Sequence, residues 1–150
     1  MSTIHWSLLK FESLTSIDCY EILQLRSAIF VVEQQCVYLD MDNKDQQSWH
    51  LLGKIDGQLA AYTRLLPAGL AFTHCSIGRV VTASTFRRAG LGKLLMAESI
   101  QCCEKLFGKG PIEIGAQLYL EKFYQSFGFN SVGEIYLEDG IEHIHMIRMA

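Results

Sequence analysis

The sequence has no uninterrupted apolar run that approaches the roughly 20 residues needed to cross a bilayer as a helix. Its first residues, MSTIHWSLLK, also lack the basic-then-apolar order of a signal peptide. The chain contains no internal repeat and no low-complexity segment. These absences favour a cytoplasmic protein and give no reason to expect a membrane as partner.

Strong charge of either sign is missing too. The net charge is -3 and charged residues make up 19% of the chain, so the basic surface typical of nucleic-acid-binding proteins is not expected. Hydrophobic residues make up 49% of the 150 residues, which is ordinary for a well-packed soluble protein. A chain of this length buries about two thirds of its unfolded surface as one domain. We therefore expect a single domain over residues 1–150.

Metal sites and disulfides are not indicated. The five cysteines are odd in number and show no C-x-x-C spacing, so they are expected to be reduced and mostly buried. His143 and His145 share a face of the last expected strand, but no third ligand is evident. Residues 40–45 depart from a calcium-binding loop, because Lys44 stands at a ligand position and glycine is missing at the sixth. No metal is therefore expected.

Hydrophobic periodicity predicts the element order β, α, ββ, β, α, β, α, ββ. Strands are expected at residues 4–8, 49–55, 59–66, 72–82, 112–114, 132–137 and 141–149, and helices at about 16–32, 92–107 and 119–127. Thr15 with Asp18 is placed to cap the first helix, Asp56-Gly57 predicts a hairpin turn, and Gly128 predicts a left-handed helix end. The hairpins imply an α+β (mixed α/β) fold, with a mixed, mostly antiparallel sheet of about seven strands flanked by about three to four helices.

Residues 33–47 lose this periodicity and gather Glu33, Asp40, Asp42 and Asp45. Loops of this length are uncommon in compact domains and are often functional, although a solvated connection is an equal alternative. The acidic groups would suit a cationic ligand.

Residues 76–95, SIGRVVTASTFRRAGLGKLL, combine a strand, a glycine-containing loop and a helix start. Gly90 and Gly92 let the backbone approach a ligand, and the helix dipole adds roughly half a positive charge there. Arg87, Arg88 and Lys93 supply formal charge. This pattern predicts an anion site, most simply for a phosphate or pyrophosphate, with an ordinary strand-to-helix turn as the alternative.

A dinucleotide-binding Rossmann unit is the competing interpretation of these glycines. Such a unit requires G-x-G-x-x-G in a parallel sheet, whereas position 95 is leucine and hairpins precede the motif. The Rossmann interpretation is therefore disfavoured.

Two motifs resemble those of the GCN5-related N-acetyltransferases (GNAT family). Arg87-x-x-Gly90-x-Gly92, after the strand Arg79-Val80-Val81-Thr82, is similar to the family's acetyl-CoA signature R/Q-x-x-G-x-G/A. Gln117-x-x-Leu120-x-x-Phe123-Tyr124, followed by Gly128-Phe129, is similar to its N-x-x-A-x-x-F-Y motif, with Gln and Leu in place of the commoner Asn and Ala. Residues 30–34, 77–80, 116–120 and 138–141 resemble the ElaA-like subgroup more narrowly.

The resemblance implies a GNAT-type acyl-CoA N-acyltransferase fold with acetyl-CoA as cosubstrate. The pyrophosphate would be held at the helix start, and pantetheine would lie along a splayed central strand. The implied cosubstrate-binding residues are Val80, Val81, Thr82, Arg87, Arg88, Ala89, Gly90, Leu91, Gly92, Lys93, Gln117 and Tyr124. Tyr124 occupies the family's general-acid position, and its alternative role is that of a core aromatic residue.

The general base is defined less well. Glu33, at the end of the first helix where family members admit the acceptor, is the catalytic candidate; His50 and His74 are further possibilities. Cys36 offers a ping-pong route through an acyl-cysteine. Each of these residues has an ordinary structural alternative.

The sequence therefore predicts an acyltransferase that moves an acetyl group from acetyl-CoA directly to a primary amine of a small molecule or peptide. Two alternatives stay open. One is an acetyl-CoA-sensing regulatory module without turnover, and the other is an acyltransferase similar to acyl-homoserine-lactone synthases. The exposed edge of the terminal hairpin would also allow a homodimer.

Overall fold

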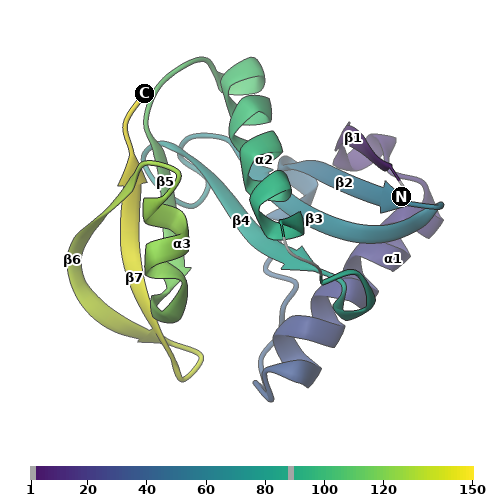
Figure 1. Cartoon of the computed structure of the whole chain (residues 1–150), viewed down its shortest axis with the longest axis horizontal. Helices are drawn as coiled ribbons and strands as arrows, with labels where there is room; N and C mark the ends of the chain where they lie inside the picture. The colour runs from purple at the N-terminus through teal and green to yellow at the C-terminus, as the bar shows by residue number, and fades with distance from the viewer. Residues whose placement is uncertain (1–2, 88–89) are drawn as a thin grey trace.

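Seven strands form one mixed sheet in the computed structural model, which describes residues 3–87 and 90–150 (Figure 1). The spatial order of the strands is β1-β2-β3-β4-β5-β7-β6. The strands are β1 (Ile4–Lys10), β2 (Trp49–Ile55), β3 (Gln58–Leu66), β4 (Cys75–Thr82), β5 (Ile112–Gln117), β6 (Phe129–Glu138) and β7 (Ile141–Arg148).

The first four strands form an antiparallel meander. Asp56 and Gly57 make the turn between β2 and β3 with φ of 50° and 77°, the left-handed values for which an Asp-Gly pair is suited. Trp6 on β1 pairs with Gly53 on β2, and a Cβ added to Gly53 would lie 2.6 Å from the Trp6 ring. Glycine at position 53 therefore lets the indole lie flat on β2.

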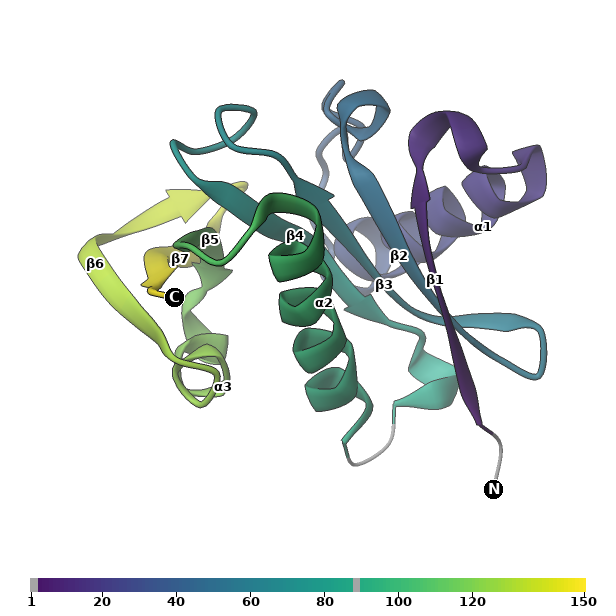
Figure 2. The ribbon, with the colours of Figure 1, turned by 90° about the horizontal axis from the view of Figure 1, so that it is seen from above.

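Helices cover both faces of the sheet (Figure 2). On one face lies α1 (Ser16–Arg26), which continues into a π-helical segment, η2 (Ser27–Glu33). Thr15 and Asp18 form the predicted capping box at its start, with Asp18 N donating to Thr15 Oγ1 at 3.0 Å. On the other face lie α2 (Leu91–Phe107) and the short α3 (Glu121–Gln125).

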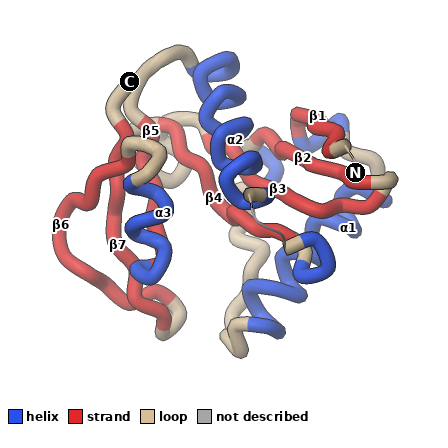
Figure 3. Tube along the Cα trace, viewed as in Figure 1, coloured by secondary structure: helices blue, strands red, loops and turns tan. Residues whose placement is uncertain are grey.

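The last three strands form a second antiparallel ladder, in which β7 lies between β5 and β6. The two ladders meet where β4 and β5 run parallel, and α2 is the crossover that a parallel connection requires (Figure 3). Asp139 and Gly140 turn β6 into β7 with φ of 51° and 79°.

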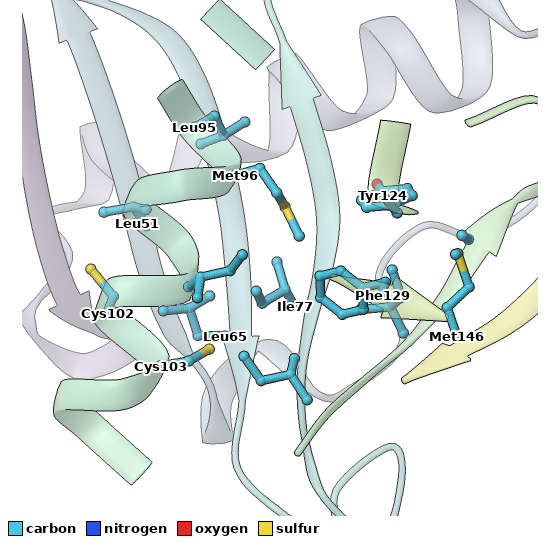
Figure 4. Packing of buried hydrophobic residues seen from close by; sticks show 14 of the residues in the cluster. Leu51, Leu65, Ile77, Leu95, Met96, Cys102, Cys103, Tyr124, Phe129 and Met146 are labelled. Atoms are coloured by element: carbon cyan, nitrogen blue, oxygen red, sulfur yellow. The ribbon is translucent and has the colours of Figure 1, made fainter. Parts of the chain in front are cut away.

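The main apolar core lies between the sheet and α2 (Figure 4). Leu95 and Met96 of α2 are fully buried, as are Phe129 and Met146 from the C-terminal ladder. A smaller cluster on the opposite face joins Ile22 and Ile29 to sheet residues Leu52, Tyr62 and Val81. The centre of the sheet is therefore packed on both sides.

The predicted fold class and element order are confirmed, and the differences lie at element ends. The fourth strand begins at Cys75, because residues 67–74 form turns in which Gly69 N donates to Phe72 O at 2.7 Å. The expected helix at 119–127 is a 3-10 turn (Leu118–Leu120) followed by α3. Gly128, at φ 92°, ends this segment as predicted. Among the described residues no helix is long and apolar enough to cross a membrane.

Candidate active site

The sheet opens beyond the short pairing between β4 and β5. These strands pair through Cys75↔Ile112 and Ser76↔Glu113 and, among the described residues, at no later position. On its other side β4 carries a bulge, because its register with β3 shifts between Tyr62 and Arg64. Within the bulge Arg79 takes a left-handed φ of 52°. The backbone of β4 that faces β5 after Ser76 is therefore left without a strand partner.

A cleft of about 750 Å³ occupies this opening. Its walls come from β4 and β5, the π-helical segment and the loop after it, the start of α2, α3 and the β6–β7 turn. The predicted site residues that line it together are Glu33, Val80, Val81, Thr82, Arg87, Gly92, Gln117 and Tyr124. A cleft of this volume is large enough for a cofactor-sized ligand.

The start of α2 lies beside the cleft. Gly90 precedes the helix with φ 96°, and among the described residues no side chain caps it. The first helical amides, those of Leu91, Gly92 and Lys93, therefore have no partner within the helix. The Leu91 side chain is buried in the core, whereas Lys93 is exposed. The predicted residues Arg88 and Ala89 lie outside the described part of the chain.

Arg87 and Glu33 form a bidentate ion pair across the cleft mouth. Arg87 Nη1 donates to Glu33 Oε1 at 2.9 Å and Nη2 to Oε2 at 2.6 Å. The hydrogen bond from Arg87 lowers the pKa of Glu33, and the bond to Glu33 raises the pKa of Arg87. Glu33 is thereby a weaker base while the pair persists.

Tyr124 lies in the wall of the cleft with 6% of its surface exposed. Its ring makes edge contacts with Phe123 and Phe129, at centroid separations of 5.2 and 6.0 Å. Burial raises the pKa of Tyr124. No hydrogen bond to its hydroxyl is described within residues 3–87 and 90–150, so the phenol, which the raised pKa keeps protonated, has a proton available to donate.

Two contacts bridge the open end of the sheet. The amides of Gln34 and Gln117 exchange hydrogen bonds of 3.3 and 3.4 Å. Beside them the Cys36 thiol donates to the Asp139 carbonyl oxygen at 3.1 Å. The loop after the π-helical segment is thus tied to β5 and to the β6–β7 turn.

Arginines pair with Asp40, Asp42 and Asp45 of the acidic loop, which argues against the expectation that Asp40 and Asp42 serve a cationic ligand. The fully buried Arg26 donates to Asp40 Oδ2 at 2.7 Å and to Asp45 Oδ1 at 2.8 Å. Arg64 donates to both Asp42 oxygens, at 2.7 and 2.9 Å. A third arginine, Arg79, donates to Asp40 Oδ1 at 2.7 Å. The charges of the three aspartates are therefore balanced by three arginines.

This arginine–aspartate network was missed at the sequence level. Burial raises the pKa of Asp42, but hydrogen bonds from Arg64 and the charges of Arg64 and Arg79 outweigh burial and hold that pKa well below its usual range. A signal was available, because Arg26 falls on the apolar face of the first helix and Arg64 interrupts an apolar strand. A buried arginine requires an anionic partner, and the nearby loop supplies one.

Of the four histidines named from the sequence, one lines the cleft. His143 does so, whereas both ring nitrogens of buried His50 are engaged, with Tyr62 Oη at 2.6 Å and Asp45 O at 2.9 Å. His74 and His145 both contact Glu113, at 2.6 and 2.9 Å. In the described part of the chain no group of three or more His, Cys, Asp or Glu side chains is placed to hold a metal ion.

Comparison with known proteins shows which family and which solved structures this chain is similar to. A family model described as the acetyltransferase (GNAT) domain matches residues 22–149. A UPF0039 protein from Synechocystis is 43% identical over 96% of this chain and 94% of its own. The crystal structure of Escherichia coli ElaA superposes with a TM-score of 0.91 at 40% identity, covering 97% of this chain and 99% of that one. An acyl-CoA N-acyltransferase from Pseudomonas aeruginosa gives a TM-score of 0.90 at 41% identity, covering 96% and 99%.

Proposed function

This chain belongs to the GNAT acetyltransferase family, and from that premise we propose that it transfers an acetyl group from acetyl-CoA directly to a primary amine of a small molecule or peptide. The observation that carries the proposal is the opening between β4 and β5, which ends beside the uncapped start of α2. An extended chain of amides that ends in a pyrophosphate matches this arrangement of unpaired backbone and helix amides.

The cosubstrate would be held mainly by the backbone. The pantetheine amides would bond those backbone groups of Val80, Val81 and Thr82 that face β5, together with the Gln117 amide on the facing strand. The pyrophosphate would lie at the amides of Gly90, Leu91, Gly92 and Lys93 and at the predicted residues Arg88 and Ala89. Arg87 would add charge after exchanging Glu33 for a phosphate. Both side chains of this ion pair are exposed, and solvent screens such pairs, so the exchange of one anion for the other is expected to be easy.

Transfer requires an oxyanion site and a proton for the leaving thiolate. The free N–H groups near Val81 are suited to the oxyanion, and Tyr124 is suited to protonate the CoA sulfur. The raised pKa and unpartnered hydroxyl of Tyr124 support this role, because the group is protonated at neutral pH and faces the cleft. Glu33 remains the sequence-based candidate for the base.

The proposal is tested by thermal unfolding and by thiol release. Millimolar acetyl-CoA or CoA is expected to raise the Tm, because a ligand that binds only the folded chain stabilises it. Thiol release from acetyl-CoA is then followed with polyamines, amino acids, aminoglycosides and lysine peptides. A rise in Tm without thiol release from any amine would favour the sensing module, and no rise in Tm would overturn both readings.

We further propose that two copies pair along β6. This strand is at the edge of the sheet and exposes Val132, Ile135 and Leu137, at 46%, 51% and 71%. Unpaired edges of this kind favour strand pairing between copies. Light scattering after size exclusion should give the mass of a dimer, and Ile135→Lys should give a monomer; a monomeric wild type contradicts the pairing.

A further inference from the structure

The cleft contains a histidine–carboxylate pair that the transfer described above does not use. Building on the proposed acetyl transfer, we propose that His143 is the general base that takes the proton of the acceptor ammonium, and that Glu138 is the anion that attracts this ammonium and stabilises the resulting imidazolium. The two side chains are on neighbouring strands, with His143 Nε2 3.6 Å from Glu138 Oε2.

The position of His143 separates it from the other histidines. Among the described residues it is the histidine that lines the cleft, together with Val80–Thr82 and Tyr124. His50 has no free ring nitrogen, and the pKa of His50 is lowered by burial. His74 and His145 each contact the Glu113 carboxylate through one ring nitrogen and are not among the cleft-lining residues.

Hydrogen bonding fixes which nitrogen of His143 can accept a proton. Nδ1 lies 2.8 Å from the carbonyl oxygen of Ile141. A carbonyl oxygen only accepts, so Nδ1 carries the hydrogen and Nε2 bears the lone pair of the neutral ring. The ring also stacks on Tyr136, with centroids 5.7 Å apart and planes at 29°, which holds its orientation.

The surroundings of Nε2 favour a positively charged acceptor. Glu138 has 60% of its side chain exposed, and it shares the cleft wall with Asp139 of the β6–β7 turn. From β5, Gln117 is the register partner of His143 and is uncharged. The cationic substrate that the sequence assigned to Asp40 and Asp42 is thus moved to the other wall, where the carboxylate faces no arginine in any described contact.

Glu33 is the competing base. Its carboxylate receives both Arg87 hydrogen bonds, and the resulting fall in its pKa reduces its affinity for an ammonium proton. The Glu33 carboxylate already accepts two hydrogen bonds from a cation, whereas Nε2 of neutral His143 accepts none in the described contacts.

The chemistry balances as follows. The Nε2 lone pair of His143 takes one proton from the acceptor ammonium, and the freed amine attacks the thioester carbonyl carbon, forming the C–N bond and an oxyanion. The oxyanion collapses and the C–S bond breaks. The Tyr124 hydroxyl protonates the CoA thiolate and regains its proton from the second N–H of the former amine through solvent. His143 then releases its proton to solvent.

The decisive test compares two nucleophiles in wild type and His143→Gln. One is the best ammonium acceptor of the thiol-release screen, and the other is hydroxylamine, which is largely unprotonated at pH 7 and needs no base. His143→Gln should lower kcat/KM about 100-fold for the ammonium acceptor and change it little for hydroxylamine. His145→Gln, two residues away on the same strand, is the matched control and should behave as wild type. CoA affinity should be unchanged in both variants.

Several outcomes overturn this assignment. An equal loss for both nucleophiles would indicate a structural role for His143, and a selective loss in Glu33→Gln instead would make Glu33 the base. Nitrogen-15 NMR of the free protein must place the neutral proton on Nδ1 of His143, whatever the acceptor is; a proton on Nε2 contradicts the proposal. A wild type that releases no thiol with any amine overturns the proposed transfer itself and this inference with it.

Discussion

The guanidinium of Arg87 lies where two anions compete for it, the Glu33 carboxylate in the structure and a phosphate of the proposed cosubstrate. We expect Arg87→Gln to weaken CoA binding about tenfold, because one charge-assisted contact is lost. Glu33→Gln should keep or improve the affinity, because it frees Arg87. Calorimetric titration with CoA measures both, and an unchanged Kd in Arg87→Gln would remove this residue from the site.

Tyr124 can be tested without disturbing the fold. Its hydroxyl has no hydrogen-bond partner among the described residues, so Tyr124→Phe should leave the Tm almost unchanged. Turnover should fall about 10- to 100-fold, since a thiol with a pKa near 8.5 needs only modest acid help. Steady-state thiol release and thermal unfolding measure the two effects. Full activity in the variant would show that solvent protonates the thiolate.

At the scale of residues, the sequence predicts groups that lie in a continuous motif and misses groups that meet through the loop. Arg87, Gly92 and Tyr124, which the resemblance to two family motifs predicts as site residues, all line one cleft. The partners of Arg26 stand 14 and 19 residues away, on a loop whose path no periodicity defines. The proposed role of His143 as a base could not be inferred from the sequence either, because it depends on which ring nitrogen contacts the Ile141 carbonyl oxygen.

Elements were predicted where periodicity and turn chemistry agree. The Asp56-Gly57 hairpin and the Thr15 cap are local effects, and both are confirmed. Periodicity could not predict the bulge at Arg79, because the register with β3 and the ion pairs with the loop decide it. It also merged the 3-10 turn at Leu118–Leu120 with α3, since both have apolar residues at similar spacing.

The β1–β2 pair offers a test at the scale of the element. Gly53→Ala places a Cβ 2.6 Å from the Trp6 ring and 2.8 Å from Ile4 Cδ1, so the Trp6 ring and the Ile4 side chain, or the strands that carry them, must shift. We expect a loss of about 1–3 kcal/mol in the free energy of unfolding, as for other overpacked sites. Denaturant unfolding followed by tryptophan fluorescence measures it.

Gly110→Ala is the matched control, because among the described residues no atom beyond its immediate chain neighbours lies within 4 Å of the added Cβ. Its free energy of unfolding should stay within about 0.5 kcal/mol of wild type. Equal effects of the two substitutions would show that loss of glycine flexibility, and not contact with Trp6, determines the result.

The arginine–aspartate network affects the stability of the whole molecule. Asp42 and Asp45 have a lowered pKa in the folded chain, because arginine hydrogen bonds and charges outweigh the opposing effect of burial. The unfolded chain therefore binds more protons near about pH 4, and the stability from these groups is present above that pH and lost as the pH falls below it. Urea unfolding at a series of pH values should show this acid limb.

Asp45→Asn removes one partner of the buried Arg26 and Arg64 and should destabilise the fold by about 3 kcal/mol at neutral pH. Its acid limb should be shallower than that of wild type, because one titrating carboxylate is gone. Exposed Glu12→Gln should change stability by less than about 0.5 kcal/mol. An Asp45→Asn variant as stable as wild type would show that the network contributes no net stability.

The short pairing at Cys75 and Ser76 joins the two ladders of the sheet at one end of β4 and β5. The four-stranded ladder lies on one side of this short pairing and the three-stranded ladder on the other. At the open end of the sheet, the neutral Gln34–Gln117 and Cys36–Asp139 hydrogen bonds connect the loop after the π-helical segment to β5 and to the β6–β7 turn. The apolar core beneath α2, however, packs Leu51 and Leu65 of one ladder together with Phe129 and Met146 of the other. Core packing as well as these neutral bonds therefore sets the angle between the two ladders, and with it the width of the cleft.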